Sequence, residues 1–214
     1  MPLLLGHRGA RATKDIPENT LASFDRALQH GCDGFEFDVR LTKDRVAVVC
    51  HDADLQGRNI AKSSRPDLAE LPTLDEVLDR YPASVFLDIE LKVEGLEDSV
   101  VNLLAKRGDA LGIVVTSFLP EVVQKTKAAL PDLACGLICE KQSELKKYPD
   151  VSCEWLMLER ALVSNELVSS VHAAGRKLGV WTVNRAADMQ SFADWGVDAI
   201  ISDDTELLIA TLRP

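Results

Sequence analysis

Two histidines stand where short apolar runs of this chain end. His7 follows the run LLLG, and His51 follows VAVVC. A lone histidine at the end of a strand is more often structural, but imidazole titrates near neutral pH, so a pair at one site can remove one proton and donate another. The pair therefore predicts acid–base catalysis, with His7 and His51 as the catalytic residues.

Carboxylates occupy alternate positions of two apolar runs, Glu36 and Asp38 in FEFDV and Glu90 in IELK. Side chains alternate across a strand, so Glu36 and Asp38 face the same side. Buried carboxylates that converge repel one another unless a cation neutralises them. We expect Glu36, Asp38 and Glu90 to bind one divalent cation, Mg²⁺ or Ca²⁺, because both ions accept oxygen ligands. The alternative is a set of structural ion pairs with Arg8 and Lys92.

Arg8 and Lys92 add positive charge beside these groups. A guanidinium offers paired N–H donors to a phosphoryl group, and an ammonium acts as a point charge. A metal with two cations stabilises negative phosphoryl oxygens, while two histidines serve the attacking and leaving oxygens. This combination favours phosphodiester cleavage over glycoside hydrolysis, which needs two carboxylates but neither a metal nor a basic pair.

The elements that must position these residues alternate between strands and helices. Apolar runs occur at LLLGH, GFEFDV, SVFLDIEL, GIVVTSF, LACGLIC, EWLMLE, KLGVWTV and DAIISD, and stretches with helical spacing separate most of them. Such alternation indicates a parallel sheet. Eight runs predict an α/β fold, a single-domain (β/α)₈ TIM barrel over residues 1–214, with the site at the carboxyl ends of its strands. An open doubly wound sheet is the alternative.

One run breaks the alternation. VAVVC follows FEFDVR after only LTKDR, which is too short for a parallel crossover of about a dozen residues. We therefore expect a β-hairpin that brings His51 back to the level of Asp38. The following stretch, about residues 53–70, is polar and irregular, and we expect it to form a short insertion over the active-site face.

Composition narrows the classes of function. The chain has 214 residues, 46% of them hydrophobic, and a formal net charge of −10, which argues against nucleic acid and anionic lipid as partners. No segment reaches the roughly 18 apolar residues of a membrane helix, so no stable membrane insertion is expected. The short apolar N-terminus indicates a buried strand rather than a signal peptide. Five cysteines without a disulfide framework favour reduced thiols and a cytoplasmic protein. The sequence does not indicate the oligomeric state.

The motifs also resemble a known family, the glycerophosphodiester phosphodiesterases. The resemblance covers nearly the whole chain, and HRG, PENT and ExD are highly specific in combination. Its elements, in order, are HRGA at 7–10, PENT at 17–20, EFDV at 36–39, HD at 51–52, IELK at 89–92, TSF at 116–118, WTVN at 181–184 and DAIISDD at 198–204.

The resemblance implies metal-dependent hydrolysis of deacylated phospholipid head groups to sn-glycerol 3-phosphate and an alcohol. By motif position, His7 and His51 resemble the acid–base pair. Glu36, Asp38 and Glu90 resemble the metal ligands, and Arg8 and Lys92 the phosphate contacts. Trp181 resembles an aromatic residue of the substrate pocket, although on its own it reads equally well as core. Glu18 and Asn19 are expected to brace the site.

Two routes of cleavage remain open: attack by the glycerol 2-hydroxyl through a cyclic phosphate, and direct attack by water. Two other functions also remain open. One is a lysophospholipase D or sphingomyelinase D-like activity, and the other a catalytically silent barrel that binds phosphorylated metabolites. The second would be indicated by the loss of a rim histidine or of a metal carboxylate, and all of them are present.

Overall fold

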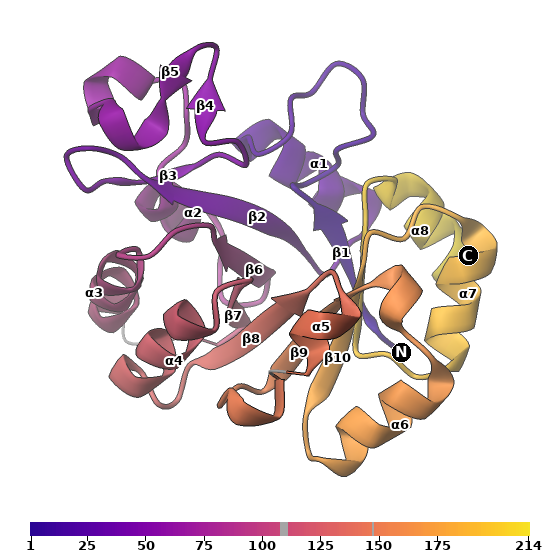
Figure 1. The fold of residues 1–214 in the computed structure, drawn as a ribbon. Coiled ribbons are helices and arrows are strands. Elements are labelled where there is room, and N and C mark those ends of the chain that lie inside the picture. The colour runs from indigo at the N-terminus through magenta and orange to yellow at the C-terminus, as the bar shows by residue number, and fades with distance from the viewer. Residues whose placement is uncertain (108–110, 147) are drawn as a thin grey trace.

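The computed structural model describes residues 1–107, 111–146 and 148–214, and it contains a closed barrel (Figure 1). Strand β1 pairs in parallel with both β2 and β11, so the sheet closes on itself. This closure confirms the predicted (β/α)₈ barrel and excludes the open sheet. The eight parallel strands are β1 Leu3–His7, β2 Gly34–Leu41, β6 Phe86–Leu91, β7 Ile113–Ser117, β8 Ala134–Cys139, β9 Trp155–Glu159, β10 Lys177–Trp181 and β11 Ala199–Ser202.

Helices surround the barrel and cover the outer face of its strands (Figure 1). None among the described residues is long and apolar enough to cross a membrane. The described part of the crossover between β8 and β9 contains the short α5 and the 3₁₀ turn Tyr148–Asp150. The helices are α1 Leu21–His30, α2 Leu74–Arg80, α3 Glu97–Arg107, α4 Pro120–Ala129, α5 Gln142–Leu145, α6 Asn165–Ala173, α7 Ala186–Asp194 and α8 Thr205–Leu212.

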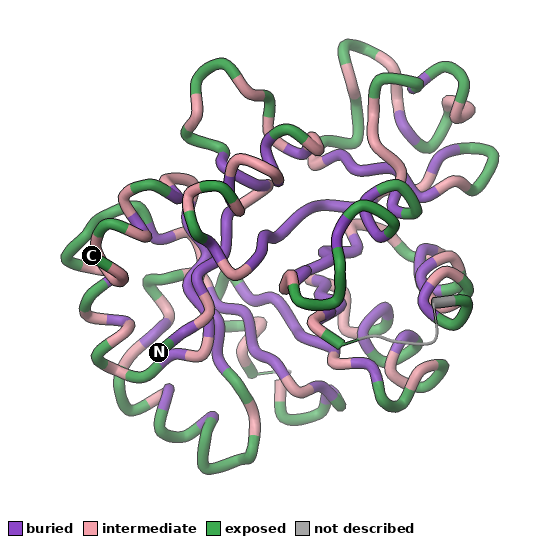
Figure 2. The backbone as a smooth tube through the Cα atoms, turned by 180° about the vertical axis from the view of Figure 1, so that it is seen from behind, coloured by how far each residue is buried: buried purple, intermediate pink, exposed green. Residues whose placement is uncertain are grey.

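The alternation of side chains along each strand separates two apolar layers. Phe35 and Phe37 point outward from β2, and Phe35 stacks on Phe24 of α1 with ring centroids 4.2 Å apart. A smaller cluster fills the barrel interior and includes Met157 and Ile201. Buried residues line the strands, while exposed residues lie on the outer helices and loops (Figure 2). The polar residues of the barrel interior therefore lie next to a packed apolar layer.

The predicted hairpin is confirmed. Strand β3, Ala47–Val49, runs antiparallel to the end of β2, with Val39 opposite Val49. The segment 53–70 then forms a two-stranded hairpin of β4 (Asp54–Leu55) and β5 (Arg58–Asn59), followed by two 3₁₀ turns. Ile60 and Leu68 of this segment pack on Val48 of β3. None of its residues lines the cavity described below.

Local end signals place the first helix. Thr20 caps α1 by accepting a hydrogen bond from the backbone N–H of Ser23, and Gly31 ends the helix with φ of 103°. Because Thr20 caps the helix, the side chain of the preceding Asn19 is left for another contact, described below. The five cysteines are free and buried, in agreement with reduced thiols.

Candidate active site

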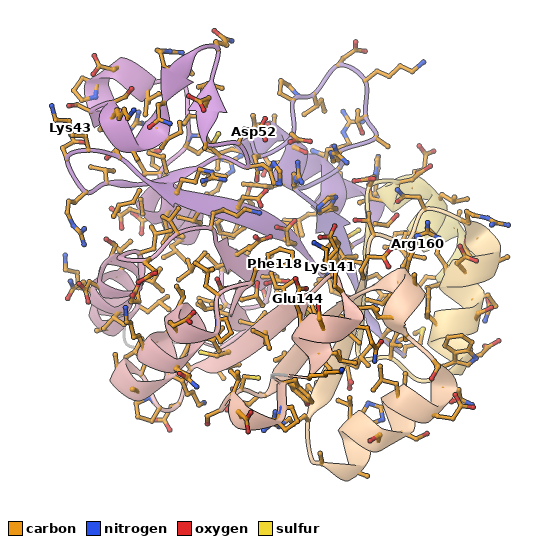
Figure 3. All side chains as sticks on the ribbon, in the orientation of Figure 1. Lys43, Asp52, Phe118, Lys141, Glu144 and Arg160 are labelled. Atoms are coloured by element: carbon orange, nitrogen blue, oxygen red, sulfur yellow. The ribbon has the colours of Figure 1, made fainter. Side chains whose placement is uncertain are left out.

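The carboxyl ends of the strands surround a cavity of about 280 Å³. One side is polar and comes from β1, β2, β6 and the loop after β3, whereas the other side is apolar except for Glu140, which follows β8. Phe118 belongs to the apolar side and lies near the centre of the barrel mouth (Figure 3). The lining residues are His7, Arg8, Glu36, His51, Asp88, Glu90, Lys92, Phe118, Ile138, Glu140, Met157, Trp181 and Ile201.

Three predicted metal-binding carboxylates meet at this end of the barrel. Asp38 on β2 stands directly opposite Glu90 on β6, and Glu36 lies two residues deeper on β2. One oxygen from each carboxylate lies within 4.8 Å of the others. All three residues are buried. The alternation argued from the sequence is thereby confirmed, and the group could hold a cation.

The two predicted phosphate contacts lie against these carboxylates. The Nζ atom of Lys92 is 3.2 Å from Asp38 Oδ1 and 2.5 Å from Glu90 Oε1. Arg8 Nε is 3.2 Å from Asp38 Oδ2. The ion pairs considered as an alternative to a metal site are therefore present. They join Arg8 and Lys92 to Asp38 and Glu90, and neither side chain forms such a pair with Glu36.

A cation fits the remaining carboxylate. Glu36 Oε2 accepts a hydrogen bond of 3.0 Å from the backbone N–H of Arg8, but the buried Oε1 has no hydrogen-bond partner among the described residues. A buried carboxylate oxygen without a donor is costly. A divalent ion bound by oxygen ligands would remove that cost, so the residues present suit such an ion.

Burial and mutual repulsion shift the ionisation of this group. Burial and the charge of Asp38 raise the pKa of Glu36 well above its ordinary range, and the same causes raise the pKa of Glu90 to about 7. Burial would also raise the pKa of Asp38, but Lys92 and Arg8 outweigh it and hold that pKa below its usual value. A bound cation would therefore favour the ionised form of these carboxylates.

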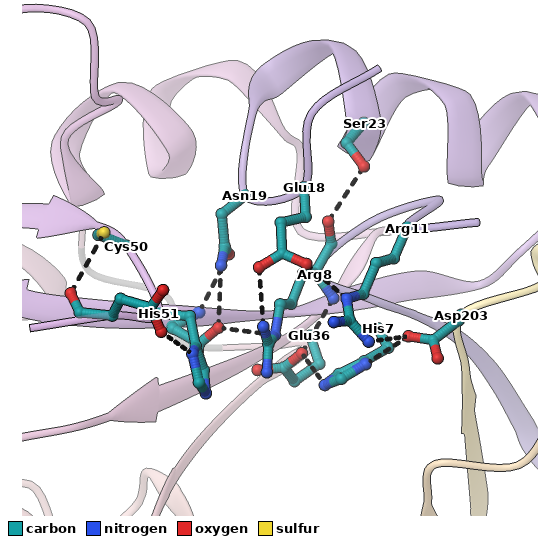
Figure 4. Close-up of polar contacts among 12 residues, drawn as sticks. His7, Arg8, Arg11, Glu18, Asn19, Ser23, Glu36, Cys50, His51 and Asp203 are labelled. Atoms are coloured by element: carbon teal, nitrogen blue, oxygen red, sulfur yellow. Dashed lines mark hydrogen bonds and ion pairs between the residues drawn. The ribbon is translucent and has the colours of Figure 1, made fainter. Parts of the chain in front are cut away.

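His7 is held by a carboxylate from the far end of the chain (Figure 4). Its Nδ1 lies 2.7 Å from Asp203 Oδ1, and its Nε2 lies 3.8 Å from Glu36 Oε2. Asn184 donates to the other oxygen of Asp203 at 2.7 Å. Burial opposes ionisation of Asp203, but the hydrogen bond from His7 holds its pKa far below the usual range. An ionised Asp203 fixes the proton of His7 on Nδ1 and leaves Nε2 toward the cavity.

His51 reaches the mouth from outside the barrel, as the hairpin predicted. Its Nδ1 lies 2.8 Å from Oδ1 of the neighbouring Asp52. Arg40 Nε donates to the backbone carbonyl of His51 at 2.7 Å, and the backbone N–H of Cys50 donates to the backbone carbonyl of Asp38 at 3.0 Å. The side chain of His51 is 35% exposed, compared with 14% for His7.

The loop between β1 and α1 braces the site in the manner expected of Glu18 and Asn19. Glu18 Oε1 accepts a hydrogen bond of 2.7 Å from Arg8, and Glu18 Oε2 accepts one from Arg11. Asn19 Nδ2 donates to Asp38 at 2.9 Å. Arg8 and Asn19 both adopt left-handed backbone conformations, with φ of 52° and 57°. The loop therefore connects one carboxylate of the triad to the chain that follows His7.

Trp181 is both a pocket residue and a core residue, the two roles considered from the sequence. It lines the cavity, and it also packs on the interior apolar cluster. Its ring meets Phe118 edge to face, with centroids 5.8 Å apart. Phe118 also lies beside Lys92, whose Nζ atom is 5.6 Å from the centre of its ring.

Sequence reasoning missed several residues of the site, among them the carboxylates Asp88, Glu140 and Asp203. Asp88 lines the cavity and lies two residues deeper than Glu90 on the same face of β6, so the alternation rule could have found it. Asp203 lies within the quoted run DAIISDD, but its contact with His7 spans 196 positions. Only the closure of the barrel between β1 and β11 brings these two residues together.

Comparisons with known proteins agree with this geometry. A sequence model of the glycerophosphoryl diester phosphodiesterase family matches residues 7–84 and 53–207. A glycerophosphodiester phosphodiesterase of Caldanaerobacter subterraneus subsp. tengcongensis is 30% identical over 239 residues, covering 99% of this chain and 98% of that protein.

Solved structures show the same fold. An Oleispira antarctica phosphodiesterase, solved in complex with the product sn-glycerol-3-phosphate, superposes with a TM-score of 0.86 at 26% identity over 100% of this chain and 98% of that one. A glycerophosphodiester phosphodiesterase of Thermotoga maritima gives a TM-score of 0.85 at 25% identity, with 98% of each chain covered. The chain belongs to the glycerophosphoryl diester phosphodiesterase family and is a phosphoric diester hydrolase.

Proposed function

We propose that the chain hydrolyses glycerophosphodiesters to sn-glycerol 3-phosphate and an alcohol at the barrel mouth. His7 and His51 act as base and acid, and Glu36, Asp38 and Glu90 hold one Mg²⁺ or Ca²⁺. The observation that carries the proposal is the convergence of the buried triad with two histidines around one cavity. The sn-glycerol-3-phosphate bound in the Oleispira antarctica relative supports the proposal that the substrate contains a glycerol phosphate group.

His7 is the better base of the two histidines. Because Asp203 accepts its Nδ1–H, the Nε2 atom carries a lone pair and lies on the cavity side beside Glu36. The ionised Asp203 also stabilises the imidazolium that forms when Nε2 takes a proton. That proton comes from the attacking oxygen, which is either the glycerol 2-hydroxyl or a water molecule.

His51 is better placed to act as the acid. It lies at the more exposed edge of the mouth, from which the alcohol must depart into solvent. A protonated Nε2 there donates to the leaving oxygen. Arg8 and Lys92 bind the non-bridging phosphoryl oxygens, whose negative charge they balance. A bound divalent cation supplies further stabilisation of that negative charge.

Two measurements test the metal assignment, thermal unfolding in the absence of substrate and the rate of hydrolysis. In the wild type, Mg²⁺ or Ca²⁺ raises the midpoint of thermal unfolding and supports release of glycerol 3-phosphate from glycerophosphocholine, and EDTA removes both effects. Glu36→Gln and Glu90→Gln abolish the metal-dependent thermal shift and lower kcat/KM by about a hundredfold or more. Glu121→Gln, an exposed substitution on α4, is the control and keeps both properties. Full activity after complete chelation would refute the assignment.

The cavity also favours deacylated substrates over the lysophospholipase D alternative. An acyl chain needs an apolar surface leading from the mouth, but the large hydrophobic side chains exposed among the described residues are Met1 and Leu111. Leu111 precedes β7 and so lies at the opposite end of the barrel. We expect kcat/KM for glycerophosphocholine to exceed that for its acylated lyso form, measured as choline release from each.

A further inference from the structure

Asp88 is a fourth carboxylate of the lumen, and the mechanism above does not use it. It stands opposite Glu36 in the β2–β6 register, two residues deeper than Glu90. It lines the cavity, and its relative exposure is 2%. It lies outside the triad that could hold a cation. A carboxylate in such a position requires a hydrogen-bonding role.

Only part of that requirement is met within the protein. Thr116 Oγ1 donates to Asp88 Oδ1 at 2.6 Å. Among the described residues, no other hydrogen bond or ion pair reaches this side chain. Its second oxygen therefore remains available to a molecule in the cavity. A phosphoryl group is a poor partner because it is negatively charged, whereas a hydroxyl group suits an acceptor.

Apart from Glu36, the side chains near Asp88 at this end of the cavity are apolar. Ile138, Met157 and Ile201 line the cavity there and belong to the interior apolar cluster. A ligand fragment that lies at this end must present carbon to these side chains and a hydroxyl to Asp88. The cavity measures about 280 Å³ and is closed below by packed side chains, so the fragment must also be small.

We propose that Asp88 is the residue that recognises glycerol, by accepting a hydrogen bond from its terminal, non-reacting hydroxyl. This inference rests on the proposed function and adds an orientation: the glycerol arm points down into the barrel, and the alcohol arm points toward solvent past His51. In this orientation the cavity contacts the glycerol arm and leaves the alcohol arm outside the barrel interior. Asp88 is a substrate-binding residue, and Thr116 positions its carboxyl group.

A pair of substrates tests the contact directly. Glycerophosphocholine carries the terminal hydroxyl, and 2-hydroxypropyl phosphocholine lacks it while keeping the 2-hydroxyl. We expect the wild type to prefer glycerophosphocholine by about tenfold to a hundredfold in kcat/KM, because a buried hydrogen bond to Asp88 is lost with the analogue. In Asp88→Ala this preference falls to about twofold or less.

The ratio separates recognition from structural effects. Any change in fold or metal affinity in Asp88→Ala acts on both substrates alike and cancels in the ratio. Thr116→Val is the matched control: it removes the neighbouring hydroxyl but not the free carboxylate oxygen, and it keeps a preference of at least fivefold. An unchanged ratio in Asp88→Ala, with glycerophosphocholine still hydrolysed, would overturn this inference alone. A wild type inactive on glycerophosphocholine would overturn the proposed function with it.

Discussion

The two histidines are supported very unequally. The side chains of His7 and Asp203 are 14% and 18% exposed, and Asn184 and Arg11 hold Asp203 in turn. The side chains of His51 and Asp52 are 35% and 78% exposed. A partly buried hydrogen bond to a carboxylate orients imidazole more strongly than an exposed one, because water competes less for it. Loss of the two carboxylates should therefore have different effects.

We expect Asp203→Asn to lower kcat by about a hundredfold or more with little change in KM, because the amide no longer fixes the tautomer of His7. Asp52→Asn should lower kcat by less than about tenfold. Steady-state kinetics on glycerophosphocholine measures both values. Equal losses in the two variants would contradict the unequal support of the histidines.

Most individual site residues follow from one rule, the alternation of side chains along a strand. That rule places Glu36, Asp38 and Glu90 in the lumen, as the structure confirms. It gives the face of a residue but not its partners. Asp203 could not be assigned in this way, since its partner His7 belongs to the first strand and Asp203 follows the last.

At the scale of elements, the apolar runs predict all eight barrel strands to within about two residues at each end. The runs suffice because both faces of these strands are buried. The short crossover α5 was not predicted, since its four residues carry no helical period. Lengths of crossovers depend on which strands must be bridged, and this is decided by the closed barrel rather than by local sequence.

One glycine determines how closely two of these strands approach. A Cβ atom at Gly34, the first residue of β2, would lie 1.7 Å from the backbone carbonyl oxygen of Phe86 on β6. We expect Gly34→Ala to destabilise the fold by about 3 kcal/mol or more, because backbone on the neighbouring strand must move. Urea unfolding measures the change in the free energy of unfolding.

Gly57 provides the matched control for this substitution. It has φ of 81°, and a Cβ atom built there meets no atom within 4 Å. Gly57→Ala should cost only the left-handed backbone strain, about 1 kcal/mol. If the two substitutions destabilise the protein equally, contact between β2 and β6 is not the reason for glycine at position 34.

At the scale of the whole molecule, the carboxylates of the lumen link stability to pH. Burial raises the pKa values of Asp88 and Glu90 to about 7, whereas in the unfolded chain they are near 4. Between about pH 5 and 8 the folded protein therefore binds more protons than the unfolded one. Its stability must fall as the pH rises through this range.

We expect the protein in EDTA to lose about 4 kcal/mol of unfolding free energy between pH 5.5 and pH 8, about 2 kcal/mol from each of these two carboxyl groups. With saturating Mg²⁺ or Ca²⁺ the loss should shrink or reverse, because the cation binds the ionised carboxylates and competes with protons. Urea titrations at both pH values, with and without metal, measure this. A chelated protein equally stable at both values would contradict the raised pKa values.

The antiparallel strand β3 has a further consequence for the molecule. It pairs with β2 through three residues and takes no part in the closed ring of eight strands. Among the described residues, its other edge is held only by a bridge between Val48 and Thr73, so we expect its amide protons to exchange through smaller local openings than those of the ring. We therefore expect His51, two residues beyond this strand, to take part in local openings that leave His7 in place. The mouth of the cavity can then open on the β3 side without unfolding of the eight-stranded ring.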